Sequence, residues 1–200
     1  LYGFSPESPY PLDGLVARWT FDDSNLVDSI NGYTLTCAAA QFPAGKLGKC
    51  VYTNNSNVTS NITEIKNVFA GTNQFTFSFW RKSGANKYFV CPQINTGVNL
   101  SAIIYDNSNN NITYIDRAGN SNYVAYSTYT TDTWEHFVLL FNGTNTLYYK
   151  NNSLFRTQSG TQSLTVNAFN FMDRNQSIYF DMVYIYNRAL NTAELTKLYN

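Results

Sequence analysis

Charged residues and histidine are scarce in this chain of 200 residues. Lysine, arginine, aspartate and glutamate make up 13% of it, the 13 basic residues balance the 13 acidic ones, and there is one histidine. A chain without an excess of one charge has no field that attracts nucleic acid or an anionic membrane surface. We therefore expect no nucleic-acid partner. Its polar surface must come mainly from asparagine, serine and threonine, as in many secreted and virion-surface proteins.

Long apolar runs and paired cysteines are also lacking. The longest apolar run, Phe137–Phe141, is far shorter than the roughly 18 to 20 residues of a membrane-spanning helix, so no membrane insertion is expected. Cys37, Cys50 and Cys91 form no C-x-x-C pair, and with a single histidine they do not indicate a zinc site. We expect buried thiols, with a Cys37–Cys50 bridge as the alternative.

The chain divides into a short proline-rich start and one β-rich domain. Three prolines between Ser5 and Gly14 predict an extended lead-in over residues 1–13, and the absence of a leader before it favours a mature form or a piece of a longer protein. Residues 14–200 suit a single domain. Aromatic and β-branched runs between Asn, Gly, Ser and Asp clusters predict strands. These are residues 15–21, 33–37, 48–53, 75–82, 87–94, 100–105, 111–116, 122–128, 134–142, 146–150 and 177–186. Thr192–Tyr199 is the one segment that reads as a helix.

Two of these segments indicate a sandwich of two sheets. The run from Phe75 to Trp80 alternates between phenylalanine and small polar residues until Trp80 breaks the pattern, which is typical of a half-buried strand. The run from Trp134 to Phe141 is apolar on both faces after its first residues, so it must be covered on both sides.

The last part of the chain resembles a known family. Tyr179–Tyr199, "YFDMVYIYNRALNTAELTKLY", is similar to the closing segment of laminin-G-like jelly-roll domains, a branch of the concanavalin A-like superfamily. Further landmarks follow in the family's order, namely Gly14–Asp23, Gly45–Thr53, Phe75–Lys82 and Trp134–Leu154. The resemblance spans residues 14–199, although residues 83–133 match no landmark. It implies an all-β jelly-roll sandwich of two antiparallel sheets with a short C-terminal helix.

The sequence does not favour an enzyme. Related glucanases carry acidic residues at alternate positions of one strand, because retaining hydrolysis needs two carboxyl groups about 5 Å apart. No Glu-x-Asp-x-x-Glu pattern occurs here. His136 has no Ser or Cys nearby in the sequence that would suggest a triad, so a structural role is expected for it.

A ligand platform is predicted in the stretch that matches no family landmark. Tyrosine offers a flat apolar face with a polar tip, and Asp and Arg offer planar hydrogen bonding to adjacent hydroxyl groups. The residues proposed to contact a ligand are Tyr105, Tyr114, Asp116, Arg117, Tyr123 and Tyr126. They could also be ordinary strand and rim positions. Trp19, Trp80 and Trp134 fall on family landmarks and are expected in the core.

A calcium ion is the cofactor that the resemblance implies. The family often carries calcium near a loop like the one from Asp22 to Gly32, and Asp181 matches the Asp of its closing strand. The first candidates for ligands are Asp28 and Asp181, joined by Asp22 and Asn31, because calcium takes carboxylate, amide and carbonyl oxygens. The alternative is that these side chains only satisfy turns and backbone donors.

The closing strand also carries a prediction about its faces. Alternation puts Asp181, Val183 and Ile185 on one face, and the family resemblance turns this face inward. Met182 and Tyr184 would then point outward beside Phe180. Such an apolar stripe would be covered either by the lead-in or by another copy of the chain.

Two functional hypotheses remain open. The first is a non-catalytic, lectin-like module of a larger secreted or virion-surface protein, which binds a glycan or a host surface receptor through residues 98–130. The second is a structural assembly or decoration domain of a phage or other virus particle, packed as a homo-oligomer or into a fibre. Both place the chain outside the cell or on a virion surface, and the composition is compatible with either.

Overall fold

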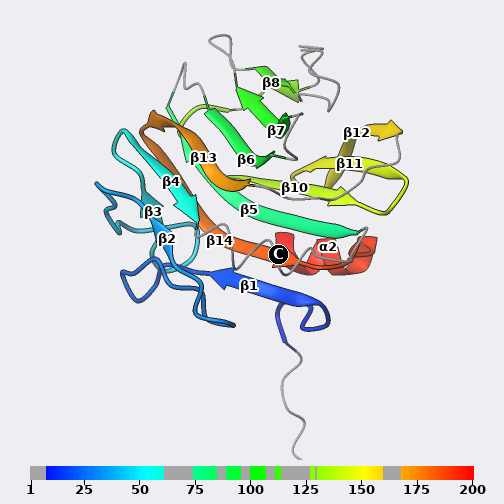
Figure 1. The fold of residues 1–200 in the computed structure, drawn as a ribbon, viewed down its shortest axis with the longest axis horizontal. Helices are drawn as coiled ribbons and strands as arrows, with labels where there is room; N and C mark the ends of the chain where they lie inside the picture. The colour runs from blue at the N-terminus through cyan, green and yellow to red at the C-terminus, as the bar shows by residue number, and fades with distance from the viewer. Residues whose placement is uncertain are drawn as a thin grey trace, which may run out of the picture.

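The computed structural model describes residues 8–60, 74–84, 89–95, 100–106, 111–113, 127–128, 130–159 and 168–200, which form two antiparallel sheets of seven strands each (Figure 1). The first sheet has the order β1 (Leu15–Trp19), β14 (Ile178–Tyr186), β5 (Phe75–Ser83), β10 (Glu135–Phe141), β11 (Asn145–Lys150) and β12 (Ser153–Ser159), and β3 (Val51–Tyr52) also pairs with β14. The second has the order β2 (Leu35–Thr36), β4 (Ser56–Ser60), β13 (Ala168–Gln176), β6 (Phe89–Asn95), β7 (Leu100–Asp106), β8 (Asn111–Thr113) and β9 (Ser127–Thr128). The expected fold class is confirmed.

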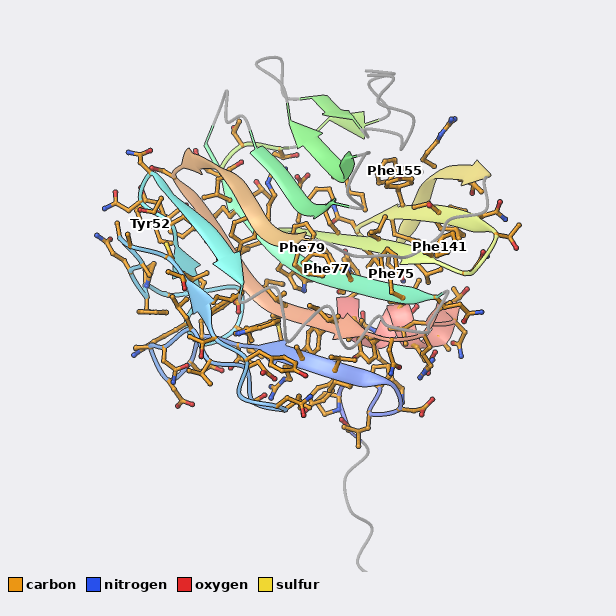
Figure 2. All side chains as sticks on the ribbon, in the orientation of Figure 1. Tyr52, Phe75, Phe77, Phe79, Phe141 and Phe155 are labelled. Atoms are coloured by element: carbon orange, nitrogen blue, oxygen red, sulfur yellow. The ribbon has the colours of Figure 1, made fainter. Side chains whose placement is uncertain are left out.

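The core between the sheets is built largely from alternating aromatic residues of β5 and β10. Phe77 and Phe79, labelled in Figure 2, are 1% and 0% exposed. The Phe79 ring lies 5.8 Å from the ring of Phe137 on β10. Leu35 and Val58 of the second sheet belong to the same cluster. The alternation expected for Phe75–Trp80 is therefore confirmed, with the phenylalanines facing the second sheet.

The outer face of the first sheet, the one turned away from the second sheet, is covered by the C-terminal helix α2 (Thr192–Tyr199) (Figure 1). Leu195 and Leu198 of α2 pack with Val138 and Leu140 of β10 in a second apolar cluster. All residues of β10 are buried. The prediction that this strand is covered on both sides is confirmed, and α2 supplies the second cover. No helix in the described part of the chain is long and apolar enough to cross a membrane.

Helix α2 is fixed at its start by reciprocal capping. The Asn191 side chain accepts a hydrogen bond from the Glu194 N–H at 3.0 Å, and the Glu194 carboxylate accepts one from the Asn191 N–H at 2.8 Å. The same carboxylate forms a two-point ion pair with Arg188, at 2.6 and 2.9 Å. Arg188 in turn bonds Asp13 of the lead-in. The helix is thus tied to the beginning of the domain.

We expect Asn191→Ala to lower the free energy of unfolding by about 1 kcal/mol, because alanine cannot accept the bond from the Glu194 N–H. Urea unfolding followed by circular dichroism measures this loss. Asn191→Ser keeps an acceptor and should stay close to the parent chain. Equal stability of all three proteins would mean that the cap does not form in solution.

The prediction about the two faces of strand β14 is wrong for Phe180 and Asp181. Phe180 does not point outward beside Met182: it is 0% exposed and lies in the core between the sheets, as do Val183 and Ile185. The pairing register with β5 shifts between Asp181 and Tyr184, and Met182 has a positive φ of 47°. This bulge places one extra residue in the strand, so Asp181, opposite Trp80 of β5, faces outward and not inward as alternation alone predicted.

The end of the lead-in folds back over the outward-facing tyrosines of β14. The Tyr10 and Tyr184 rings lie 5.5 Å apart, and the Tyr186 hydroxyl donates to the Pro11 carbonyl at 3.1 Å. Tyr184 is consequently 3% exposed. The sequence left two possible covers for this stripe, the lead-in or another copy of the chain. In the described structure the lead-in covers it.

Candidate functional site

The ligand platform predicted from the sequence falls almost wholly outside the described residues. Tyr114, Asp116, Arg117, Tyr123 and Tyr126 lie there. The backbone of Tyr105 belongs to β7 and pairs with Val90 and Thr113, while its side chain is outside the described part. These six positions stay a prediction.

Asp28, the first calcium candidate, is occupied by backbone donors. Its Oδ1 accepts hydrogen bonds from the N–H groups of Ile30 at 2.8 Å and Asn31 at 3.1 Å, and its Oδ2 accepts one from Tyr33. A longer bond of 3.4 Å comes from the Arg18 N–H on β1. The carboxylate is 3% exposed and closes the turn that follows it.

Asp181 and Asp22 hold a different turn, formed by residues 45–49. Asp181 Oδ2 accepts bonds from the N–H groups of Lys46 and Leu47, at 2.8 and 3.0 Å, and Asp22 Oδ1 accepts one from Lys49 at 2.9 Å. A Cβ added at Gly45 would lie 2.5 Å from Asp181 Oδ2, and one added at Gly48 would lie 2.0 Å from Asp22 Oδ1. The glycines of this turn allow the two carboxylates to approach its backbone.

Burial alters the acidity of Asp181. It raises the pKa of this carboxyl group to about 7, a change that the nearby charge of Asp22 supports and that the three backbone donors from Leu47, Met182 and Lys46 oppose. Because the pKa is higher in the folded than in the unfolded chain, this group favours folding below pH 4 and loses that contribution as the pH rises to about 7.

The calcium ligands predicted from the family do not come together in the described structure. Asp28 and Asp181 close separate turns, and the Asn31 side-chain amide donates to the Val16 carbonyl at 2.7 Å. Asp22 and Asp28 do border one hollow of about 150 Å³. Among the described residues, however, no group of three or more His, Cys, Asp or Glu side chains is close enough to hold an ion. As placed in this structure, these residues do not form a calcium site. Calcium binding by the chain stays a prediction.

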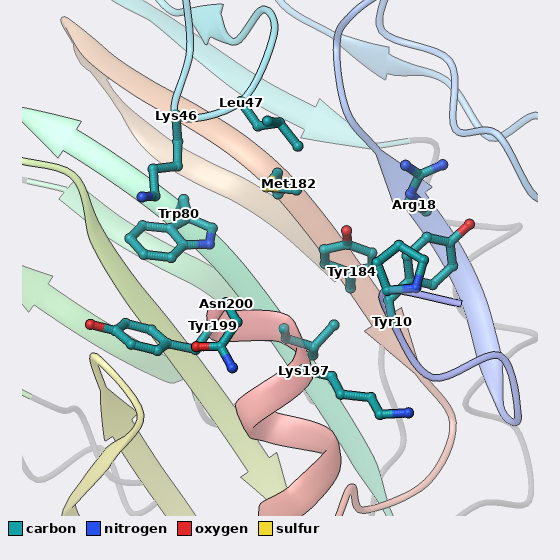
Figure 3. Close-up of a pocket in the computed structure, with 12 residues that line it drawn as sticks. Tyr10, Arg18, Lys46, Leu47, Trp80, Met182, Tyr184, Lys197, Tyr199 and Asn200 are labelled. Atoms are coloured by element: carbon teal, nitrogen blue, oxygen red, sulfur yellow. The ribbon is translucent and has the colours of Figure 1, made fainter. Parts of the chain in front are cut away.

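A cavity of about 220 Å³ lies on the outer face of the first sheet, beside the C-terminal helix (Figure 3). Trp80 of β5 and Met182 and Tyr184 of β14 contribute to its lining, and Figure 3 places Met182 between Trp80 and the pair formed by Tyr184 and Tyr10. The remaining lining comes from the lead-in, β1, the 45–49 turn and α2. These residues are Pro9, Tyr10, Arg18, Lys46, Leu47, Lys197, Leu198, Tyr199 and Asn200.

Aromatic rings hold the cations of this cavity in place. The Arg18 guanidinium lies 4.6 Å from the centre of the Tyr10 ring, and the Lys46 ammonium lies 4.6 Å from that of Trp80. Tyr199 stacks on Trp80 at 5.6 Å. The cavity therefore combines apolar ring surface with positive charge, and it contains no aspartate or glutamate among its lining residues.

An aromatic row continues from the cavity across the same sheet face. Tyr52 of β3 stacks on Tyr179 of β14 at 4.5 Å, and the Lys82 ammonium of β5 lies 4.5 Å from Tyr179 and 5.4 Å from Trp134. Lys82 is two residues along β5 from Trp80, on the same face of the strand. All four side chains of the row are partly exposed. Trp134 is thus not the core residue that we expected, whereas Trp19 is, at 1% exposed.

The single histidine does form a close pair with a serine, which the sequence did not suggest. His136 Nε2 lies 2.7 Å from the Ser78 hydroxyl across neighbouring strands. The two side chains are 1% and 0% exposed, and Nδ1 has no hydrogen-bond partner that would orient the ring. Burial lowers the pKa of His136 to about 3. A catalytic dyad would have to be reached by substrate, so this arrangement supports the structural role.

The described cysteines are free thiols. Cys37 and Cys50 are not bridged to one another, and the Cys50 thiol donates to the carbonyl groups of Pro43 and Ala44. Burial raises the pKa of Cys50 to about 12, so the thiol is unreactive. The side chain of Cys91 is outside the described part. The expectation of buried thiols is confirmed for Cys50, and the alternative bridge is wrong.

Sequence reasoning missed the cavity as a site. Its residues come from six separate segments, so no short motif contains them. Two partial signals existed: Trp80 interrupts the alternation of β5, and Tyr184 was expected to point outward from β14. Neither could show that Arg18, Lys46 and α2 meet above them.

Comparison with known proteins identifies the family. A laminin G family model, described as the concanavalin A-like lectin/glucanases superfamily, matches residues 53–196. The sequence matches none of the curated proteins with which it was compared.

Several solved structures share the fold at low sequence identity. Domain 4 of AbnA, an extracellular arabinanase from Geobacillus stearothermophilus solved in complex with arabinotriose, has a TM-score of 0.73 and 17% identity, with 93% of this chain and 98% of that domain covered. A sialidase mutant of Trypanosoma rangeli has a TM-score of 0.74 and 14% identity, with 94% of this chain and 33% of the sialidase covered. The binding domain of Paraclostridial Mosquitocidal Protein 1 has a TM-score of 0.72 and 19% identity, with coverages of 94% and 52%. The chain thus spans about a third of the sialidase and about half of the mosquitocidal binding domain.

Proposed function

The chain belongs to the concanavalin A-like lectin/glucanases superfamily, and from this premise we propose that it is a non-catalytic glycan-binding domain of a larger extracellular protein. The contact surface is the outer face of the first sheet, formed by the 220 Å³ cavity and the aromatic row of Tyr52, Tyr179, Lys82 and Trp134. The observation that carries this proposal is the meeting of partly exposed rings with a cavity on one continuous sheet face.

The chemistry of this face suits sugars. A pyranose or furanose ring has an apolar face of C–H groups that packs on an aromatic ring, and hydroxyl groups that need hydrogen-bond donors and acceptors around it. Tyr179 and Trp134 meet edge to face at 6.4 Å, so they form a stepped and not a flat platform. Lys82 lies between them as a donor.

The comparisons support the proposal at the level of the fold. One relative is a domain of an extracellular arabinanase solved with arabinotriose, and another is the binding domain of a mosquitocidal protein. Both names describe one domain of a larger protein. The buried His136 and Ser78 offer no accessible nucleophile that would favour an enzyme.

The alternative role in assembly rested on the apolar stripe of β14. Tyr184 is 3% exposed because Tyr10 and α2 cover it within the same chain. This stripe therefore gives no separate support to packing between copies.

We expect a glycan array to find saturable ligands for the whole chain, and Trp134→Ala to weaken binding of those ligands by about tenfold or more. Truncating an aromatic anchor at a binding surface commonly costs over 1 kcal/mol. Isothermal titration calorimetry with the best array ligand measures the effect. Leu154→Ala is the matched control, because Leu154 is a 48% exposed apolar residue on the edge strand β12 and belongs to neither the cavity nor the aromatic row. No binding across a broad array, or equal losses in both variants, would contradict the proposal.

A further inference from the structure

We propose that the cavity on the outer face of the first sheet selects a sugar unit that carries an anionic group, a carboxylate or a sulfate. This inference rests on the proposed glycan-binding function and specifies its ligand. It goes beyond the fold, because it depends on three cations at one place in this chain: Arg18, Lys46 and Lys197.

The positive charge is local. The chain as a whole has 13 basic and 13 acidic residues, yet the twelve residues that line the cavity include three cations and no aspartate or glutamate. Arg18 comes from β1, Lys46 from the 45–49 turn and Lys197 from α2, and they surround the cavity in Figure 3. Neutral sugars do not need such an arrangement, whereas an anion inside it would face a positive side chain on several sides.

Two of these cations form no ion pair within the described structure. The ion pairs there join Lys150 with Glu135, and Arg188 with Asp13 and Glu194. Arg18 and Lys46 take part in none of them. Arg18 contacts the Tyr10 ring, and its side chain hydrogen-bonds the Ser29 hydroxyl and the Tyr184 side chain. A guanidinium that is not in an ion pair can bind a carboxylate or sulfate oxygen through its terminal N–H groups.

Two of the three cations are held in position before any ligand arrives. Arg18 and Lys46 each lie 4.6 Å from a ring centre. The backbone of Lys46 is fixed as well, because its N–H donates to the buried Asp181 at 2.8 Å. Side chains that are ordered in the free protein lose less entropy on binding, so their charge contributes more to affinity.

The size of the cavity limits what enters it. Its volume of about 220 Å³ is below the roughly 300 to 1,000 Å³ of sites for drug-sized ligands, so it suits one sugar unit. Trp80 forms part of its wall, and Lys82 of the aromatic row is two residues further along the same strand. The next units of a polysaccharide would then lie on Tyr179 and Trp134.

The experiment compares matched pairs of oligosaccharides by calorimetry with the whole chain. Each pair contains an acidic trisaccharide and its neutral counterpart with the same linkage: galacturonate against galactose, glucuronate against glucose, and 4-sulfated galactose against galactose. We expect the acidic member of at least one pair to bind ten times or more tightly. The two uronate pairs test a carboxylate, and the sulfated pair tests a sulfate, so the result shows which anionic group the cavity prefers.

Substitutions then assign the preference to the cavity. Lys46→Gln and Arg18→Gln should each reduce the preference for the acidic member about tenfold while binding of the neutral member changes little. Lys49→Gln is the matched control: Lys49 belongs to the same turn, but its ammonium bonds Ser24 and it does not line the cavity. Thermal melting shows whether each variant is folded.

Each outcome decides between the two proposals. Equal binding of acidic and neutral members would overturn the anionic selectivity and leave glycan binding standing. Silence across every pair and across the array would overturn both. If Lys49→Gln reduced the acidic preference as much as Lys46→Gln does, the anion would be attracted by the positive charge of the surface in general and not by this cavity. That result would also overturn the inference.

Discussion

Asp28→Ala is expected to lower the free energy of unfolding by about 3 to 5 kcal/mol. The carboxylate is the acceptor for the N–H groups of Ile30, Asn31 and Tyr33 and is 3% exposed. A buried donor left without an acceptor costs about 1 to 3 kcal/mol, and the three hydrogen bonds of this turn are partly buried. For a domain of this size the loss corresponds to a fall in melting temperature of roughly 10 °C. Urea unfolding and thermal melting both measure it.

The same variant tests the calcium ligand set that the family resemblance implies. If Asp28 acts only through backbone donors, the loss is the same in calcium and in chelator, and chelator does not change the melting temperature of the parent chain. Asp28→Asn keeps one acceptor oxygen and should lose less than the alanine variant. A loss that appears only in the presence of calcium would contradict the backbone explanation and support a metal site at this loop.

The alternation of β5 and the apolar faces of β10 were sufficient to predict the two-layer fold. The phenylalanines of β5 recur every second residue and the cluster between the sheets contains them, while β10 is apolar on both faces and needs two covers. The eleven strands expected from the sequence each overlap a strand of the structure, and α2 begins and ends at the expected residues. These features depend on neighbouring residues alone, which is why a single sequence reveals them.

Three strands were not predicted, because their residues carry no clear strand pattern. β4, with the sequence SNVTS, lies in an asparagine- and serine-rich stretch, and β12 and β13 mix apolar residues with polar and charged ones. Their strand conformation comes from pairing with neighbours that are far away in the sequence, such as β4 with β13. The bulge at Met182 is also a tertiary feature: it sets Asp181 opposite Trp80, and simple alternation cannot show it.

The candidate site was beyond sequence reasoning for a related reason. Arg18, Lys46 and Lys197 are separated by 28 and 151 positions, and only the folded chain brings them to one cavity. The sequence did identify the outward position of Tyr184 and a lead-in that could cover it. It could not show that the cover leaves a hollow with three cations around it.

The second large effect concerns His136 and pH. Its side chain is 1% exposed, packed against Trp80 at 5.1 Å and Tyr199 at 5.9 Å, and bonded to the Ser78 hydroxyl. Burial lowers its pKa to about 3 from an ordinary value of 6.5. Between these values the unfolded chain binds a proton that the folded chain does not. The contribution of this group is therefore complete above pH 6.5 and falls by about 1.4 kcal/mol per unit as the pH drops toward 3.

The parent chain alone would hide this effect, because Asp181 titrates in the opposite sense over an overlapping range. Its pKa is raised to about 7, so its contribution grows as the pH falls from 7 toward 4. The measurement must therefore be a difference between the parent and His136→Asn, which can still accept the Ser78 hydroxyl but does not titrate. We expect the stability advantage of the parent to shrink by about 2 kcal/mol between pH 7 and pH 5 in urea unfolding. The same comparison in an Asp181→Asn background should give the same change. An advantage that does not depend on pH would mean that water reaches the His136 ring, and that the outer face of the first sheet is more open than the packing of Trp80 and Tyr199 implies.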